Sequence, residues 1–309
     1  MDISPLATEL AQLEHLEVSW DVPLAPYTAY RIGGPTAIWV APQTEAAVGA
    51  ALSVIDAAQA PLLVLGSGSN VLISDQGWPG VTLWLGAPLS GWQIDSREVR
   101  VCGGTLLNDL IRALVSRGLS GLEMLAGIPG TVGGALRMNA GAFGREICQV
   151  TRVVTGFDFQ GRPVRLPREA IDFGYRRASE LARVVITAAK MELIWDDSRK
   201  LQVRLQDVLA LRAKKQPLAH PSCGSVFKRP PGYFAGALIQ EAGLKGARIG
   251  DAVVSTRHAG FILNTGRATA DDVYALIRRI EAEVLARFGV QLEREVQLVG
   301  DFGGGSTES

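Results

Sequence analysis

The chain has 309 residues, of which 47% are apolar and 20% are charged. This length predicts two or three packed units, and the composition excludes a largely disordered chain. Basic and acidic residues number 31 each, which excludes proteins whose main task is to coat nucleic acid or an anionic membrane. We therefore expect no nucleic-acid partner, and any bound anion must be held by local contacts.

The N-terminus and the cysteines indicate a cytoplasmic protein. The acidic N-terminus lacks the basic-then-apolar order of a secretory signal, and no apolar run is long enough for membrane insertion. Cys102, Cys148 and Cys223 form no C-x-x-C pair, which argues against a disulfide framework. The three histidines are far apart in sequence, so we expect no metal. The oligomeric state stays open, and a monomer is compatible with the sequence.

Helices and strands are predicted from the apolar pattern of the first two hundred residues. Thr44 is the expected N-cap of a helix that extends to Ala58. Thr105 is expected to open a second helix that Gly118 ends. The predicted strands are 36–41, 61–66, 81–86, 98–104, 149–159 and 183–195. A strand, a helix and then mostly strands predict an α+β fold.

A polar break and one long helix organise the remaining third. The break is predicted at 196–200, and Thr269 is expected to begin a helix with one apolar face. The glycine-rich tail, 303–309, is predicted to be disordered. The expected division is 1–85 for a first subdomain, 86–200 for a second, 201–302 for a third part and 303–309 for the tail.

Four glycine-rich segments predict a binding site for a long anionic cofactor. Glycine permits positive φ and close approach of backbone amides to a ligand, and clustered amides form a nest for a diphosphate. A single glycine turn after a strand is usually structural, but four segments favour a ligand. They are 31–35, 66–70, 102–105 and 126–144. The sequence GSGSNVLIS continues without a helical pattern, which disfavours a dinucleotide-binding βαβ unit.

The spacing of these segments resembles the FAD-binding domain of the vanillyl-alcohol-oxidase flavoproteins. The resemblance implies an α+β fold with two subdomains that hold FAD, followed here by a C-terminal α+β substrate-binding domain. We expect non-covalent FAD, because no histidine or cysteine presents a clear tether. The cofactor-binding residues that the resemblance implies are Gly33, Gly34, Gly66, Ser67, Gly68, Ser69, Asn70, Gly104, Gly127, Ile128, Pro129, Gly130, Gly133, Asn139 and Ala140.

Further stretches of the chain resemble the family of UDP-N-acetylenolpyruvoylglucosamine reductases. These stretches are 128–144, 173–179, 221–264 and 292–300. They follow the family's order, and the compact stretch after Ser225 is similar to its shorter class, which lacks an extra tyrosine-bearing loop. The resemblance implies a ping-pong cycle in peptidoglycan precursor synthesis. NADPH reduces FAD, and the enolpyruvyl group of a UDP-sugar is then reduced to give UDP-N-acetylmuramate.

The family resemblance also implies the catalytic residues. Reduction of an enol ether beside a carboxylate needs a proton donor and a group that stabilises negative charge. Ser225 matches the proton donor, Arg176 the group that grips the substrate carboxylate, and Glu295 a residue that orients an assisting group. Without the resemblance, a turn serine and surface ion pairs are the simpler interpretation. Arg177 and Glu293 are neighbouring alternatives in the sequence. On a strand Glu293 and Glu295 would share a face, so only the family pattern selects Glu295.

Three more residues are predicted to contact the substrate. By the resemblance, Lys215 contacts the diphosphate, and Tyr175 and Lys228 lie beside catalytic residues in sequence. Without it, the charged run that ends at Lys215 is a solvated helix end. Arg229 is left unassigned, because many relatives have asparagine there.

Two other functions fit part of the sequence. An FAD-dependent oxidase of an alcohol or sugar would share only the cofactor domain, and a UDP-sugar sensor would keep the fold without turnover. The missing flavin tether and the segment from Ser225 to Glu295 argue against the oxidase. The complete set of Ser225, Arg176 and Glu295 argues against the sensor.

Overall fold

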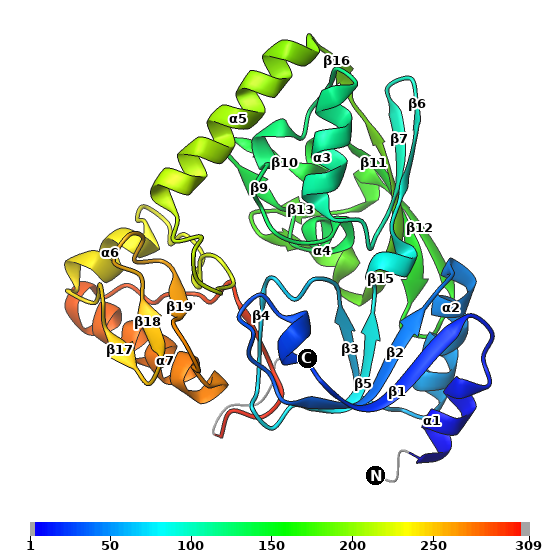
Figure 1. Cartoon of the computed structure of the whole chain (residues 1–309), viewed down its shortest axis with the longest axis horizontal. Helices are drawn as coiled ribbons and strands as arrows, with labels where there is room; N and C mark the ends of the chain where they lie inside the picture. The colour runs from blue at the N-terminus through cyan, green and yellow to red at the C-terminus, as the bar shows by residue number, and fades with distance from the viewer. Residues whose placement is uncertain (1–3, 304–309) are drawn as a thin grey trace. The chain divides into compact units, whose positions relative to one another are not determined.

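The computed structural model describes residues 4–303, which form two compact units. Unit 1 consists of the chain up to Trp20, Ala37–Ser67 and Gly80–Arg212, and unit 2 of Asp21–Thr36, Gly68–Pro79 and the chain from Ala213. Both units mix helices with strands (Figure 1), which confirms the predicted α+β class. The predicted division into three parts is finer than these units and stays a prediction. Most of the predicted disordered tail, 304–309, lies outside the described residues.

The largest sheet of unit 1 has five antiparallel strands in the order β12-β11-β15-β7-β6. Its strands are β6 (Trp92–Asp95), β7 (Glu98–Cys102), β11 (Thr151–Asp158), β12 (Pro163–Pro167) and β15 (Val184–Glu192). Ala189 of β15 lies opposite Val154 on one side and Val101 on the other, so small and branched side chains pack across the strands. The strands predicted in these regions are confirmed.

Short elements complete this part of unit 1. The two-residue strands pair as hairpins or bridges: β8 (Leu119–Ser120) with β16 (Ile194–Trp195), β9 (Gly141–Ala142) with β10 (Arg145–Glu146), and β13 (Phe173–Gly174) with β14 (Arg177–Ala178). Two helices, α3 (Leu107–Ser116) and α4 (Val132–Arg137), bury their apolar residues in the same core as the five-stranded sheet.

Thr105 does not open α3, so that prediction is wrong. Helix α3 begins at Leu107, and its N-cap residue Leu106 makes no side-chain hydrogen bond. The Thr105 hydroxyl instead accepts from the backbone N–H of Gly91 at 2.9 Å and donates to the Gly91 carbonyl at 3.0 Å. Its hydrogen-bonding capacity is thereby used by a distant turn. Gly118, which has φ of +72°, follows the helix as predicted.

A second sheet has the strand order β1-β2-β5-β3. The elements of this region are α1 (Ser4–Ala11), β1 (Leu16–Pro23), β2 (Pro35–Pro42), α2 (Glu45–Ala57), β3 (Leu62–Leu65) and β5 (Trp78–Trp84). The predicted N-cap of α2 is confirmed, because Thr44 Oγ1 accepts from the backbone N–H of Ala47 at 3.2 Å. A Cβ on Gly49 would lie 2.6 Å from the Phe157 ring, so glycine is needed for α2 to approach β11.

Helix α5 (Ser198–Lys215) was not predicted apart from its charged end, and it begins within the expected polar break. Asp197 Oδ1 accepts from the backbone N–H groups of Arg199 and Lys200 at 2.9 Å each, which satisfies two of the free donors at the helix start. Leu201, Leu205 and Val208 are buried in the core of unit 1. The many charged residues between these apolar positions hide the helical pattern in the sequence.

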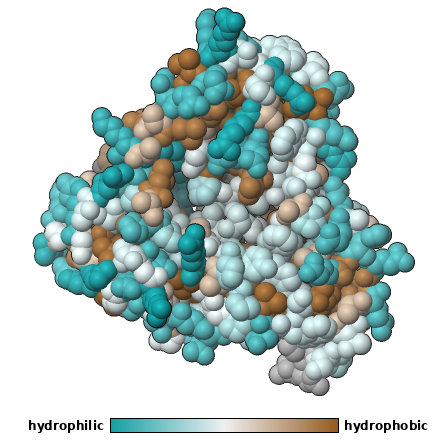
Figure 2. Space-filling model, viewed as in Figure 1, coloured by the Kyte–Doolittle hydropathy of each residue, from teal (hydrophilic) through white to brown (hydrophobic). Residues whose placement is uncertain are grey.

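Some large apolar side chains stay at the surface near α5. Figure 2 shows hydrophobic residues along the side of the molecule that α5 occupies in Figure 1, and Ile194, Trp195 and Val203 are exposed. Within residues 4–303, no helix combines the length and the hydropathy that a membrane span requires.

Unit 2 contains a three-stranded antiparallel sheet of order β17-β18-β19. Its elements are α6 (Ala235–Glu241), β17 (Arg248–Ile249), β18 (Ala252–Val254), β19 (Ile262–Asn264) and α7 (Ala270–Phe288). The predicted start of α7 is confirmed: Thr269 is the N-cap, and its side chain and that of Asp272 form a capping box. The apolar face of α7 is buried in the core of this unit.

A parallel strand pair in unit 2 joins distant parts of the chain. β4 (Val71–Ile73) pairs with β20 (Gln297–Val299), so Val71 lies opposite Gln297. The residues after Asn70 are therefore a strand and not a helix, as the sequence predicts. The pairing also brings the loop that ends at Asn70 beside the segment that carries Glu295.

Candidate functional site

A side chain of α3 hydrogen bonds to the segment from Gly127 to Gly130 in unit 1. Asn108 Oδ1 accepts from the Gly127 N–H at 2.7 Å, and Asn108 Nδ2 donates to the Ile128 carbonyl at 2.8 Å. Gly127 and Gly130 have φ of +79° and +133°, values that side chains rarely allow. The sequence reasoning missed Asn108, which has no local signal because its partners lie about twenty residues away.

Close packing explains two other glycines of unit 1. A Cβ on Gly66 would lie 2.6 Å from Thr131 Oγ1, the side chain that caps α4. A Cβ on Gly104 would lie 2.4 Å from the Gly86 carbonyl oxygen. The Gly133 N–H donates to the Gly103 carbonyl at 2.8 Å. The glycine segments 66–67, 102–105 and 126–144 therefore meet around the start of α4.

Buried polar atoms without partners occur in this group of glycine segments. Among residues 4–303, Ser67 Oγ and Asn139 Oδ1 are buried and have no hydrogen bond partner. Asn139 Nδ2 is satisfied, since it donates to Glu146 Oε2 and to the Gly174 carbonyl at 2.9 Å each. Unsatisfied buried polar groups are rare in folded proteins and need an explanation. A bound polar cofactor that hydrogen bonds to them provides one.

The remaining predicted cofactor residues lie in unit 2. Gly68 has φ of +57°, and a Cβ there would lie 2.2 Å from the Tyr27 carbonyl oxygen. The Gly68 carbonyl accepts from the Ala29 N–H at 3.0 Å. Gly34 donates its N–H to the Ser74 carbonyl at 2.9 Å, and a Cβ on it would lie 2.3 Å from the Asp75 carbonyl oxygen. Gly33 and Gly34 thus have a packing role against the segment 73–77.

Each unit, taken by itself, contains some of the predicted cofactor residues. Unit 1 has tight glycine turns and buried polar atoms without partners, and unit 2 has the tight turn at Gly68. The residues of unit 1 fit FAD in that Ser67 Oγ and Asn139 Oδ1, two buried polar atoms without a partner, lie in the glycine-rich segments.

Backbone hydrogen bonds of unit 2 place Ser225 beside Glu295. The Glu295 N–H donates to the Val226 carbonyl at 2.8 Å, and the Val226 N–H donates to the Gly260 carbonyl at 2.9 Å. Ser225 itself forms a bridge with Phe261. The segment around Ser225 therefore lies between two partners that are distant in the sequence.

The structure separates Glu295 from its neighbour Glu293. Glu293 is 72% exposed and forms an ion pair with Lys228, whereas Glu295 is half-buried. The expectation that both lie on one strand is wrong, because β20 begins at Gln297 and residues 293–295 contain only one bridge, at Arg294. Lys228, a predicted substrate contact, already has a carboxylate partner in the protein.

His258 is a neighbour of Ser225 that the sequence reasoning did not assign. Its Nδ1 accepts from the Gly260 N–H at 3.2 Å, and its ring packs edge-on against Phe261 at 4.9 Å between centroids. A Cβ on Gly260 would lie 3.1 Å from His258 Cε1 and 3.8 Å from Ser225 Oγ. Burial lowers the pKa of His258, which favours the neutral imidazole.

Arg176 lies in unit 1 with an unusual backbone. Its φ is +53°, a left-handed value that is uncommon for a residue with a side chain. Its Nη2 donates to the Gly141 carbonyl at 3.1 Å, and its guanidinium lies 5.0 Å from the centre of the Tyr175 ring. Arg177, the alternative, forms an exposed ion pair with Asp172 at 2.7 Å. Strained residues of this kind often lie at functional sites.

Tyr175 and Lys215, the other predicted substrate contacts, are exposed. Lys215 is the last residue of α5.

The cysteines are protonated in the folded protein. The Cys223 thiol donates to the Val71 carbonyl at 3.2 Å, and burial raises the pKa of Cys223 to about 12. Burial likewise raises the pKa of Cys102 and Cys148. Within the described part of the chain, no three His, Cys, Asp or Glu residues are grouped closely enough to hold a metal ion.

We predict that alkylation spares Cys223 in the native protein. With iodoacetamide at pH 8, its modification should be roughly a hundredfold slower than in the unfolded chain, because only a thiolate attacks. Peptide mapping by mass spectrometry measures this, and the unfolded protein is the control. Rapid modification of native Cys223 would show that the thiol is accessible or ionised.

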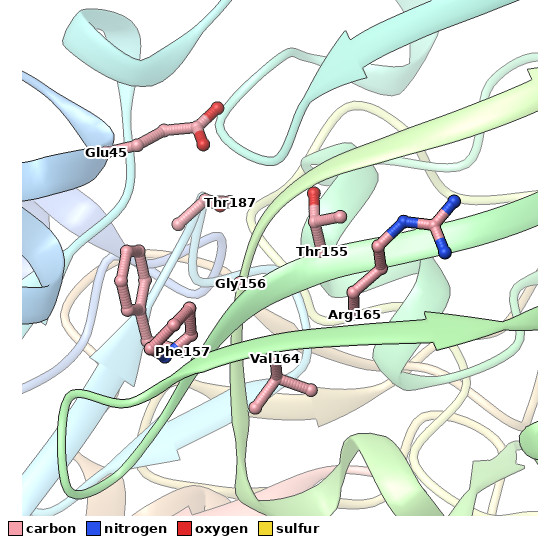
Figure 3. Close-up of a pocket in the computed structure, with 8 residues that line it drawn as sticks. Glu45, Thr155, Gly156, Phe157, Val164, Arg165 and Thr187 are labelled. Atoms are coloured by element: carbon pink, nitrogen blue, oxygen red, sulfur yellow. The ribbon is translucent and has the colours of Figure 1, made fainter.

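A hollow on the five-stranded sheet of unit 1 is lined by a different set of residues. Its lining residues are Glu45, Thr155, Gly156, Phe157, Pro163, Val164, Arg165 and Thr187, none of them a predicted site residue. Glu45, on its rim in Figure 3, is held by an ion pair with Arg100 at 3.0 Å. We assign this hollow no role in catalysis.

Comparison with known proteins places these residues in context. Residues 216–299 match the family model of the UDP-N-acetylenolpyruvoylglucosamine reductase C-terminal domain, and residues 36–160 match that of an FAD binding domain. The chain is 43% identical over 284 residues to the UDP-N-acetylenolpyruvoylglucosamine reductase of Heliobacterium modesticaldum, covering 91% of this chain and 90% of that protein. It is 40% identical to the enzyme of the same name from Pediococcus pentosaceus, covering 95% and 96%.

A solved structure agrees with these sequence matches. The crystal structure of UDP-N-acetylenolpyruvylglucosamine reductase from Thermus caldophilus superposes with a TM-score of 0.75 at 35% identity. It covers 92% of this chain and 99% of that one.

Proposed function

Because the chain belongs to the UDP-N-acetylenolpyruvoylglucosamine reductase family, we propose that it reduces UDP-N-acetylglucosamine enolpyruvate to UDP-N-acetylmuramate with FAD and NADPH. The observation that carries this proposal is identity of 43% across 91% of the chain. The FAD binding domain match and the unpartnered polar atoms of unit 1 support the cofactor. When bound, FAD supplies two-electron transfer from NADPH to the vinyl carbon of the substrate.

Ser225 is the proposed proton donor. Addition of a hydride to the vinyl carbon leaves negative charge on the α-carbon and the carboxylate. The α-carbon must then gain a proton. A serine hydroxyl is a weak acid, but an enolate-like carbon is basic enough to take its proton when nearby donors stabilise the alkoxide. The backbone bonds around Val226 support this role, since they fix the position of Ser225 without using its side chain.

Arg176 and Glu295 complete the proposed catalytic set. The Arg176 guanidinium is planar and can bind the substrate carboxylate through two parallel hydrogen bonds. The half-buried Glu295 orients the polar group or water that assists protonation of the α-carbon. Their assignment to the same reaction as Ser225 rests on the family resemblance.

Tyr175, Lys215 and Lys228 are proposed to contact the UDP-sugar. Lys228 must exchange its ion pair with Glu293 for the substrate, and an exposed ion pair costs little to break. The predicted cytoplasmic location and peptidoglycan precursor synthesis as the setting are part of the same proposal.

A visible spectrum tests the proposed function. The purified protein should be yellow, NADPH should bleach it without oxygen, and the enolpyruvyl UDP-sugar should restore the colour. Bleaching by a simple alcohol with rapid reoxidation by oxygen would indicate an oxidase instead. Binding of the UDP-sugar without restored colour would indicate a sensor, and a folded protein that binds no FAD would refute the proposed reductase.

A further inference from the structure

Arg212 lies near the end of α5 and has no role assigned from the sequence. Among the cationic residues of unit 1 within residues 4–303, it is the one with a buried donor atom that has no hydrogen bond partner. Its Nε is buried and makes no hydrogen bond. Its guanidinium lies 5.6 Å from the centre of the Phe143 ring, a contact between a cation and an aromatic face. Such a contact does not satisfy the Nε–H donor, which therefore stays available to a ligand.

Arg212 is packed directly against the glycine segment that is predicted to run along the flavin. A Cβ on Gly127 would lie 2.7 Å from Arg212 Cδ and 3.3 Å from its Nε. Any side chain at position 127 would therefore displace the arginine. Gly127 is thus required both for its φ of +79° and for the position of Arg212.

The electrostatic surroundings of Arg212 oppose its charge. Burial and the positive charge of Arg176 both lower the pKa of Arg212, and no carboxylate of the described chain offsets them. Arg176 reaches the same region, since its Nη2 bonds to Gly141, two residues before Phe143. Two guanidinium groups close together at a partly dry surface are unfavourable unless an anion binds there.

We infer that Arg212 binds the flavin ring of FAD and stabilises the negative charge that the ring carries after reduction. This inference rests on the proposed function only for the presence of FAD. Arg176 is left for the substrate carboxylate, so the two cations have separate anionic partners. Arg212 is then a cofactor-binding residue that controls how readily NADPH reduces the flavin.

Sulfite binding and the reduction potential of the holoenzyme test this inference without turnover. Sulfite adds to the oxidised flavin through a new S–N bond and leaves negative charge on the ring, so it reports nearby cations. Arg212→Met should weaken sulfite binding at least tenfold and make the reduction potential more negative. Arg212→Lys should restore part of both. Arg199→Met, which removes an exposed charge from the same helix, is the matched control and should change neither.

A measurement of substrate binding distinguishes the flavin from the substrate as the anion that Arg212 binds. Binding of the enolpyruvyl UDP-sugar to the oxidised holoenzyme, followed by the flavin spectrum, should be weakened by Arg176→Lys and little changed by Arg212→Met. Weaker substrate binding in Arg212→Met with unchanged sulfite binding and potential would overturn the inference, because the anion would then be the substrate. Should Arg212→Met fail to hold FAD, the second neutral variant Arg212→Gln decides, and wild-type sulfite binding and potential in that variant would also overturn it. These measurements need only bound FAD, so they stand even if the protein does not turn over the UDP-sugar.

Discussion

In holoenzyme with Ser225→Ala, NADPH should still reduce the bound flavin at nearly the wild-type rate, while reduction of the UDP-sugar should slow by about 10²–10⁴-fold. The hydroxyl acts only when the α-carbon takes a proton, which belongs to the second half-reaction. The backbone bonds that hold this segment do not involve the serine side chain, so the fold should be kept. Stopped-flow absorbance with each substrate in turn measures the two half-reactions separately.

Ser222→Ala is a matched control for this prediction. Ser222 lies three residues upstream and is also half-buried, so its loss removes a similar hydroxyl from the same loop. Both half-reactions should stay near the wild-type rate. If Ser225→Ala slowed both half-reactions equally, Ser225 would be a structural residue and the proposed proton donor would be lost.

Gly68→Ala should destabilise the protein by about 4 kcal/mol and abolish retention of FAD, because two penalties coincide at this position. The φ of +57° is unfavourable for any L-residue, and the added Cβ would lie 2.2 Å from the Tyr27 carbonyl oxygen and 2.8 Å from Thr28 Cα. Both contacts are with backbone, so the loop itself must move. Denaturant unfolding gives the stability, and flavin fluorescence after gel filtration gives the retained cofactor.

Gly243→Ala separates the two penalties. Gly243 has φ of +77°, but a Cβ there would meet nothing within 4 Å. Its substitution should cost only the conformational term, about 1–2 kcal/mol, and should leave FAD bound. Equal destabilisation by the two substitutions would show that the close approach at Gly68 is not important.

Local sequence signals predicted the elements whose hydrogen bonds are local. Thr44 and Thr269 cap helices that begin at the next residue, and both predictions are confirmed because the partner of each hydroxyl lies three residues away. Thr105 has the same residue type, but its partner is Gly91, and no local pattern reveals that bond. Helix α5 was missed because only Leu201, Leu205 and Val208 are buried among many charged residues.

The candidate site shows the same limit more strongly. The glycine segments could be identified because their composition is unusual, yet their Asn108 support and the Arg212 contact depend on residues far away in the sequence. The proximity of Ser225 and Glu295 depends on pairing across about seventy residues, and only a family resemblance pointed to both. The roles of these residues stay predictions.

The parallel pairing of β4 with β20 links the loop that ends at Asn70 to the segment that carries Glu295. Asn70 donates from its side chain to the Glu295 carbonyl at 2.9 Å and accepts from the Gln297 N–H at 3.0 Å. Ordering of the loop by a diphosphate would therefore also restrain Glu295, and by thermodynamic reciprocity a ligand held at Glu295 would tighten the loop. Binding of the cofactor and the positioning of Glu295 for the protonation step would then depend on the same conformational equilibrium.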